Sequence, residues 1–277
     1  MSSADQTVLL TGATSGLGEW TARQLAGKGV TVLLHGRNEQ RCRQLAAELT
    51  SAGGRVHPVV ADLSSLAATA DLGRRIAAEF GALTVLVNNA GVGGGRPDSG
   101  RELSQDGYEL RYAVNYLAPV VLSRALVPTL RANRPARIVN VGSVGQSEPD
   151  LSDLRMDRGY DRVAAYTRSK FALAAFTFDL AEELQGTGVT VNCLHPANFM
   201  DTPQVREAGI QPWSTVESGG EPLLALILGP AGAEVTGGYF DGKRKSRAHT
   251  AAYDPAVRGR LRETTDALIR KSVPHLG

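Results

Sequence analysis

The sequence predicts an α/β protein with one doubly wound Rossmann-type domain, in which helices cover both faces of a seven-stranded parallel sheet. Short β-rich runs alternate with helical patterns along all 277 residues, as expected of consecutive βαβ units. These runs are almost continuously apolar, which is typical of strands covered by helices on both faces. No repeat, composition shift or linker marks a boundary, so residues 1–277 are expected to form a single domain.

Seven runs are expected to be the strands: TVLLTG (7–12), VTVLLHG (30–36), VHPVVA (56–61), LTVLVNN (83–89), ARIVNVGS (136–143), VTVNCLHP (189–196) and GGYFD (237–241). Helical spacing predicts helices at 16–28, 38–51, 64–80, 106–131 and 160–185. A further helix is expected from Asp254, an N-cap residue followed by Pro255 at the first helical position. Its apolar stripe, Val257, Leu261, Leu268 and Ile269, is expected to cover the core or to join an interface.

The composition is that of a soluble globular protein, with 42% hydrophobic and 21% charged residues and a net charge of +2. This balance argues against nucleic acid as the main partner, and the basic run at 242–247 is expected to be a solvated loop. The longest apolar run, at 223–228, is too short to span a bilayer, and the first residues lack a signal-peptide pattern. We expect a cytoplasmic protein with reduced Cys42 and Cys193 and no bound metal.

Two long segments, 146–161 and 196–222, follow predicted strands at their carboxyl ends. In an open α/β sheet this edge binds the ligand, so both segments are placed for function. Apolar residues of the second segment are expected to close over a ligand or to pack into the domain or an interface: Phe199, Met200, Ile210, Pro212 and Trp213. We predict a substrate lid at 197–222 and a bulky apolar substrate.

The first strand ends in TGATSGLG, which places Gly12, Gly16 and Gly18 at the turn into a helix. Such a turn lets backbone N–H groups and a helix N-terminus approach a pyrophosphate, and it indicates a Rossmann-type nucleotide site. The alternative is a tight turn without a ligand.

The end of the second strand is where an acidic residue would bind the ribose of NAD(H). That place reads His35, Gly36, Arg37 and Asn38, so the acid is missing and a guanidinium is present. Arg37 favours NADP(H), because a guanidinium suits a 2′-phosphate by charge and by its forked donors. Otherwise Arg37 is a surface residue at a helix start.

Tyr166 and Lys170 stand four residues apart in AAYTRSKFA, on one face of a predicted helix. A tyrosine and a lysine at this spacing are more often an ordinary surface contact than a catalytic pair. However, other motifs accompany it in a fixed order: TGATSGLG, Asp62-Leu63, Asn88-Asn89-Ala90-Gly91, Asn115 in AVNYLAP, and Ser143. Together they resemble the short-chain dehydrogenase/reductase family over nearly the whole chain. The stretches around 107–123 and 150–173 are most similar to its retinol-dehydrogenase-like group.

The resemblance implies a catalytic set of Asn115, Ser143, Tyr166 and Lys170. Tyr166 would be the acid/base, and Lys170 would bind the ribose and draw the phenol pKa down toward working pH. Ser143 would donate to the substrate oxygen, and Asn115 would anchor a water-mediated proton relay. The implied cofactor residues are Gly12, Thr14, Ser15, Gly16, Leu17, Gly18, Arg37, Asn38, Asp62, Leu63, Asn89, Ala90, Gly91, Tyr166, Lys170, Pro196, Asn198 and Thr202.

The chain departs from the family pattern at several places. Pro196 is followed by Ala197 where glycine is usual, and Thr202 comes one residue later than the usual threonine, so either Asn198 or Thr202 would contact the nicotinamide amide. Ser15 stands where NADP-preferring members often have a basic residue. His195 adjoins the site and is expected to be a hydrogen-bonded strand-end residue.

The leading prediction is an NADP(H)-dependent ketoreductase, an oxidoreductase that interconverts a ketone and a secondary alcohol. An epimerase or dehydratase on the same scaffold, or a non-catalytic NADP(H) sensor, is the alternative. The resemblance also implies a homo-oligomer that associates through the helices at 106–131 and 160–185.

Overall fold

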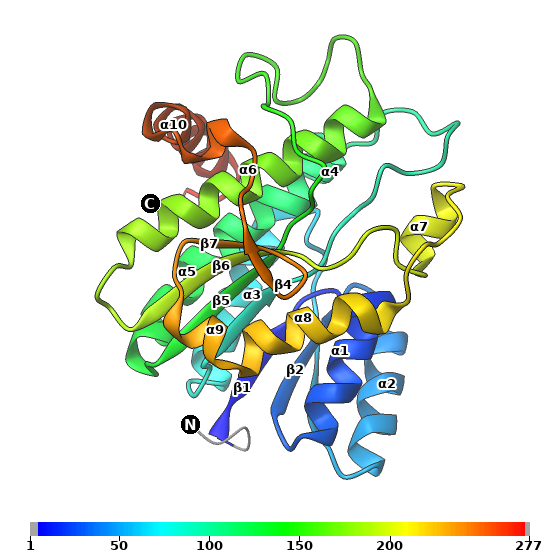
Figure 1. Ribbon diagram of the computed structural model, residues 1–277, viewed down its shortest axis with the longest axis vertical. Coiled ribbons are helices and arrows are strands. Elements are labelled where there is room, and N and C mark those ends of the chain that lie inside the picture. Colours follow the sequence, from blue (N-terminus) through cyan, green and yellow to red (C-terminus); the bar gives the residue numbers. More distant parts are fainter. Residues whose placement is uncertain (1–4, 275–277) are drawn as a thin grey trace.

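The computed structural model describes residues 5–274 and contains one sheet between two helical layers (Figure 1). The strand order is β3-β2-β1-β4-β5-β6-β7-β8, with parallel pairing from β3 to β7. The strands are β1 (Thr7–Leu10), β2 (Thr31–Gly36), β3 (Arg55–Val60), β4 (Val85–Asn88), β5 (Ala136–Val141), β6 (Val189–His195), β7 (Gly238–Asp241) and β8 (Arg244–Ser246). All seven predicted strands are present.

The eighth strand corrects the predicted sheet and the loop predicted at 242–247. β8 pairs with β7 in antiparallel orientation, with Asp241 opposite Arg244. Gly242 has φ +57 and allows the tight turn between the two strands. The side chains of Arg244 and Lys245 are nevertheless exposed, so the basic run is solvated as expected.

Alternation along the strands divides the core into two layers. Val8 and Leu10 of β1 pack with the helices of one face, whereas Leu9 packs with those of the other face. Figure 1 shows α1 (Gly16–Gly27), α2 (Glu39–Ser51) and α8 (Val216–Leu228) together on one side of the sheet. The opposite layer contains α3 (Leu66–Glu79), α5 (Ala118–Ala132) and α6 (Arg162–Glu183). The remaining short helices are α7 (Pro203–Glu207), α9 (Pro230–Glu234) and η3 (Thr250–Tyr253).

The helix predicted at 106–131 consists of three consecutive pieces. It begins with α4 (Leu110–Tyr112), continues as a π-helical segment η2 (Ala113–Leu117) and ends as α5. Pro119 has no N–H to donate to the carbonyl of Asn115, which favours the wider turn at this point. The combined helix, Leu110–Ala132, is long and apolar enough to cross a membrane, but 72% of its most apolar window is buried within the fold.

The C-terminal helix α10 (Pro255–Ser272) packs against α6 and α3 and is joined to α5 by an ion pair. Tyr116 bonds to Thr265 at 2.7 Å, and Arg124 pairs with Asp266 at 2.6 Å. Residues 171–178 of α6 are buried all around the helix, because α6 packs against β6, η2 and η3 as well as α10. Thus α10 covers the face that the resemblance assigns to a partner subunit.

The segment predicted as a lid has two parts. Residues 216–222 form the first turns of α8, where a Cβ atom on Gly220 would lie 2.1 Å from the Trp20 ring. This close packing fixes the end of the segment against α1. The part before it, 197–215, lies outside the layers and is tied by bonds from Trp213 N to Phe199 O (3.0 Å) and from Asp201 N to Ser214 O (2.9 Å). The lid stays a prediction, and the packing of α8 limits any such movement to 197–215.

Candidate active site

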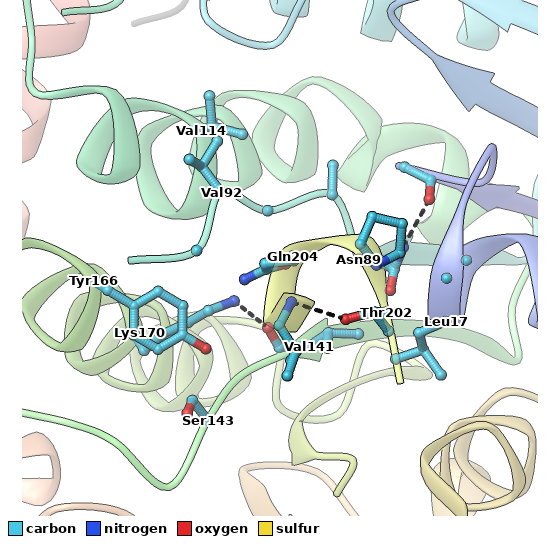
Figure 2. A pocket seen from close by; sticks show the side chains of 18 of the residues that line it. Leu17, Asn89, Val92, Val114, Val141, Ser143, Tyr166, Lys170, Thr202 and Gln204 are labelled. Atoms are coloured by element: carbon cyan, nitrogen blue, oxygen red, sulfur yellow. Dashed lines mark hydrogen bonds between the residues drawn. The ribbon is translucent and has the colours of Figure 1, made fainter. Parts of the chain in front are cut away.

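A cavity of about 660 Å³ opens at the carboxyl ends of the parallel strands. It extends from the glycine-rich turn after β1 to the loops after β5 and β6 (Figure 2). Of the predicted site residues, those that line the cavity are Gly12, Thr14, Ser15, Gly16, Leu17, Gly18, Arg37, Asp62, Leu63, Asn89, Ala90, Gly91, Ser143, Tyr166, Lys170, Pro196, Asn198 and Thr202. Asn38 and Asn115 do not line it.

The glycine-rich turn has the shape of a nucleotide cradle. Gly12 has φ +64, and a Cβ atom there would lie 2.7 Å from the Ala90 Cα. A Cβ atom on Gly18 would lie 2.0 Å from the carbonyl oxygen of Gly12, so both close approaches require glycine. Ser15 occupies the N-cap of α1 without a side-chain cap, which leaves N–H groups of the first turn free for an anion. The turn therefore fits the pyrophosphate of a dinucleotide.

His35, for which the sequence suggested no role, holds this turn from beneath. The Gly12 N–H donates to its Nδ1 at 3.3 Å, and its Nε2 donates to the carbonyl of Ala61 at 3.2 Å. Burial lowers the pKa of His35 to about 4, so the imidazole is neutral at pH 7. One side chain thus connects the glycine turn with the end of β3.

The end of β2 presents Arg37 to the cavity. Its side chain is exposed, next to Asp62 at the end of β3. Burial tends to raise the pKa of Asp62, but hydrogen bonds from Ser64 and Gln105 and the charge of Arg37 lower it overall. Asn38 instead caps α2, where its Oδ1 accepts the Arg41 N–H at 2.9 Å. The Asn38 side chain is turned toward the N–H groups at the start of α2, and for this reason it does not line the cavity.

The predicted catalytic pair lies on α6, which begins at an Asp161 cap. Figure 2 shows Tyr166 and Lys170 side by side, with Ser143 from the end of β5 near the phenol. Lys170 Nζ donates to the carbonyl of Val141 at 2.8 Å and lies 5.8 Å from the centre of the Tyr166 ring. Three groups for proton transfer and oxyanion stabilisation therefore meet at the cavity floor.

The pKa shifts correct one expectation. Burial raises the pKa of Tyr166, and hydrogen bonding with Ser143 only partly opposes this. Lys170 does not draw it down, because its ammonium is directed at the Val141 carbonyl. Burial also lowers the pKa of Lys170 to about 8, so the ammonium form predominates at neutral pH.

Asn115 supports the site from behind the cavity wall. Its Nδ2 donates to Val92 O and to Ser169 Oγ, both at 3.0 Å, and its Oδ1 accepts the Val92 N–H at 2.7 Å. The side chain is thus fully engaged in joining η2 to the loop after β4 and to α6. Its part in a proton relay stays a prediction.

Two residues at and beyond the end of β6, His195 and Thr202, complete this side of the cavity. Thr202 caps α7, and a Cβ atom on Gly16 would lie 3.0 Å from its Cγ2, so Thr202 lies against the nucleotide cradle. His195 lines the cavity, but its buried Nε2 has no hydrogen-bond partner in the described chain. The prediction of a fully bonded strand-end histidine is therefore wrong for this atom.

The half of the cavity beyond Ser143 and Tyr166 is lined mostly by apolar side chains, together with Arg162, Thr167 and Gln204. Its wall includes Val92, Leu110, Val114, Val144, Val163, Phe199 and Ile210. Trp213 does not line the cavity; it is 74% exposed and packs edge-on against Phe199, with ring centres 4.7 Å apart. Pro212 also lies outside the lining.

Comparison with known proteins agrees with this geometry. A family model described as short chain dehydrogenase matches residues 6–212, which include the glycine turn and the Ser143, Tyr166 and Lys170 cluster. The chain belongs to the short-chain dehydrogenase/reductase family. It is therefore an enzyme of an oxidoreductase family that uses nicotinamide cofactors, and the predicted resemblance is confirmed.

Individual members of the family support the retinol-dehydrogenase-like grouping. The chain is 32% identical to mouse retinol dehydrogenase 13 over an alignment of 290 positions, gaps included, which covers 98% of this chain and 85% of that protein. It is 34% identical to mouse polyprenol dehydrogenase, over 91% of this chain and 80% of that protein. A gluconate 5-dehydrogenase-like structure from Beutenbergia cavernae, with bound NADP, aligns with a TM-score of 0.69 and 32% identity over 85% of this chain and 94% of that chain.

Proposed function

We propose that the protein is an NADP(H)-dependent oxidoreductase that interconverts a ketone and a secondary alcohol on a bulky apolar substrate. The observation that carries this proposal is the cluster of Ser143, Tyr166 and Lys170 at the floor of a cavity with an apolar outer half. Polar groups that converge at one end of an apolar pocket fix a reacting oxygen while the wall buries the rest of the substrate.

The bound nicotinamide would supply or accept the hydride. In the reductive direction, Ser143 Oγ donates a hydrogen bond to the carbonyl oxygen, and the Tyr166 hydroxyl gives that oxygen its proton as negative charge develops. Lys170 would stabilise the phenolate that remains once its ammonium turns from the Val141 carbonyl toward Tyr166. In the oxidative direction, Tyr166 takes the proton back. Gly12 and Gly16 of the turn, Asn89 after β4, and Lys170 at the ribose would hold the dinucleotide.

The preference for NADP(H) rests on the end of β2. Arg37 lines the cavity beside Asp62, and no carboxylate occupies residues 35–38, where a ribose-binding acid would stand. A guanidinium there attracts the additional phosphate of NADP(H). The related structure with bound NADP supports a nicotinamide dinucleotide at this site.

The apolar wall supports the substrate class. Relatives of this chain are named for retinol and polyprenol, which are long apolar primary alcohols, so they support the bulky apolar character of the substrate and not the secondary position of its hydroxyl. The exposed faces of Val144, Val163, Phe199 and Ile210 at the mouth are suited to the burial of such a chain, at about 25 cal/mol per Å² of apolar surface. Closure of residues 197–215 over this wall would complete the enclosure.

The first test is turnover of apolar ketones and alcohols, followed by the change in nicotinamide absorbance. Stoichiometric consumption of NADPH is expected, whereas an epimerase or dehydratase would regenerate its cofactor and a sensor would consume none. Tyr166→Phe should abolish turnover but leave cofactor binding nearly intact, since it removes only the transferable proton. Lys170→Met should damage both. Turnover like that of the wild type in Tyr166→Phe would overturn the mechanism.

The cofactor choice is tested separately with Arg37→Ala. NADPH binding should weaken about tenfold or more, because a charge-assisted phosphate contact is lost, while NADH binding should change little. Fluorescence titration with both cofactors provides the measurement. Equal losses for the two cofactors would make Arg37 a structural residue only.

A further inference from the structure

Arg162 is a charged residue in the substrate half of the cavity to which the proposed reaction gives no role. It is the first residue of α6 and lies one turn before Tyr166 on the same helical face. The other charged side chains of the cavity are Arg37 and Asp62 at the end proposed for adenosine, and Lys170 beside the phenol. Arg162 therefore brings a positive charge to a wall whose other side chains, such as Val163, Phe199 and Gln204, are apolar or uncharged.

The guanidinium of Arg162 keeps most of its donors available. Its NH1 lies 3.3 Å from the carbonyl oxygen of Gly95 and 3.5 Å from that of Gly94, at the long end of the hydrogen-bond range. Its Nε and NH2 have no acceptor, and no carboxylate pairs with it, within residues 5–274. A fork of two N–H groups is thus free beside the substrate path.

The loop at 93–95, which Arg162 contacts, is already held in place by another arginine, Arg111. The fully buried Arg111 donates to Gly93 O at 2.8 Å and pairs with Glu109 at 3.0 Å. It holds the loop at 93–95 from inside the protein. The weaker contacts of Arg162 add little to this clamp, and they leave its charge uncompensated.

We propose that Arg162 binds a carboxylate of the substrate, so that the enzyme acts on apolar carbonyl compounds that also carry an acidic group. This inference rests on the proposed function and narrows its substrate class. The fork of one guanidinium matches the two oxygens of a carboxylate. A phosphate dianion would call for a second cation, and the described lining of this half offers none. The reacting carbonyl would lie at Ser143 and Tyr166, with the aliphatic chain along Val144 and Val163.

The test compares matched substrates in matched variants. A short series of methyl-ketone fatty acids and their methyl esters would be assayed with NADPH. Arg162→Met removes the cation and keeps an unbranched apolar side chain. Arg162→Lys keeps the positive charge but lacks the paired N–H donors of the guanidinium. The control is Arg168→Met, which removes an arginine from the same helix outside the cavity lining.

The wild type should reduce the acids with a kcat/KM about tenfold or more above that of the esters. Arg162→Met should lose this advantage mainly through a higher KM for the acids, with the esters nearly unchanged, and Arg162→Lys should retain part of it. Arg168→Met should behave like the wild type. Equal losses on acids and esters in Arg162→Met, or no preference for acids in the wild type, would overturn the inference while the oxidoreductase function stood.

A binding measurement keeps the inference testable without turnover. Decanoate and methyl decanoate, as probes, would be titrated into the NADPH-loaded protein by calorimetry. Decanoate should bind the wild type and Arg168→Met, and its affinity should fall about tenfold in Arg162→Met. No binding of decanoate, or unchanged binding in Arg162→Met, would refute the carboxylate site. Absence of turnover on every carbonyl compound would instead count against the proposed function.

Discussion

Single side chains in this protein hold the nucleotide site by bonds that cross between elements. His35 bonds to Gly12 through one ring nitrogen and to Ala61 through the other. Each nitrogen needs a different protonation state for these bonds, so the pair of contacts requires the neutral imidazole. Protonation of His35 would place two N–H donors in the ring and remove the acceptor for Gly12.

The folded state therefore resists protonation of His35, and this predicts a pH dependence of stability. Its pKa is lowered from 6.5 to about 4, so its stabilising contribution is complete above pH 6.5 and is lost as the pH falls toward 4. The loss is at most about 3 kcal/mol, at 1.36 kcal/mol per pKa unit. His35→Asn removes the titration and keeps an acceptor, so its free energy of unfolding should be lower at pH 7 but should change less between pH 7 and pH 4.5.

Urea denaturation between pH 7 and pH 4.5 measures the free energy of unfolding of each variant. The control is His57→Asn, because His57 is exposed on β3. The control should follow the pH dependence of the wild type. Parallel curves for His35→Asn and the wild type would show that His35 does not titrate between the folded and unfolded states.

At the scale of elements, a buried ion pair joins the start of the long helix to the loops of the substrate half. Glu109 caps α4 by accepting the Tyr112 N–H at 2.9 Å and also pairs with Arg111 at 3.0 Å. Arg111 in turn bonds to the hydroxyl of Tyr160 at 3.0 Å, just before α6. Both charged side chains are 0% exposed, so Glu109 depends on Arg111 for compensation, whereas Arg111 also lies 3.4 Å from Glu102.

Removal of one partner should therefore cost more than removal of both charges. Arg111→Met leaves Glu109 buried without its cation, and the free energy of unfolding should fall by about 3–5 kcal/mol. Arg111→Met with Glu109→Gln keeps an amide oxygen for the helix cap, and it should be more stable than Arg111→Met alone. Urea unfolding of the single and double variants measures this coupling. Additive losses in the double variant would mean that the two side chains act independently.

At the scale of the whole molecule, α10 covers the helical face through which the family resemblance implied association. Leu261, Thr265 and Ile269 of α10 are buried against the layer that contains α5 and α6. Arg258 pairs with Glu182 at 2.6 Å, which fixes the other end of α10 on α6. The surface through which the family resemblance implied association is therefore covered within a single chain.

Detachment of α10 should expose this apolar surface and cause self-association. Leu261→Asp places a carboxylate in the contact, and sedimentation velocity should show more dimers and larger species than for the wild type. Ala267→Asp, on the exposed side of the same helix, should leave the distribution unchanged. A wild-type dimer that Leu261→Asp dissociates would show instead that α10 itself forms a subunit interface.

The sequence by itself determined the parallel strands and the long helices, and nearly all of the site residues that it predicted do line the cavity. Strands and helices have local periodicities, and family motifs such as the glycine turn and the Tyr166–Lys170 pair occupy strand ends and helix faces that parallel topology brings to one edge. The short polar strand β8 has no such periodicity, so only its pairing with β7 revealed it.

The tertiary structure decided which partner each polar group meets. Asn38 caps a helix, Asn115 braces a loop, and Lys170 is directed at the Val141 carbonyl. The raised pKa of Tyr166 follows from burial, and the unpaired fork of Arg162 follows from the absence of a carboxylate nearby in the described chain. These properties depend on distances between residues remote in sequence. Hydrogen bonding and desolvation act over a few ångströms in space, so local sequence patterns do not encode them.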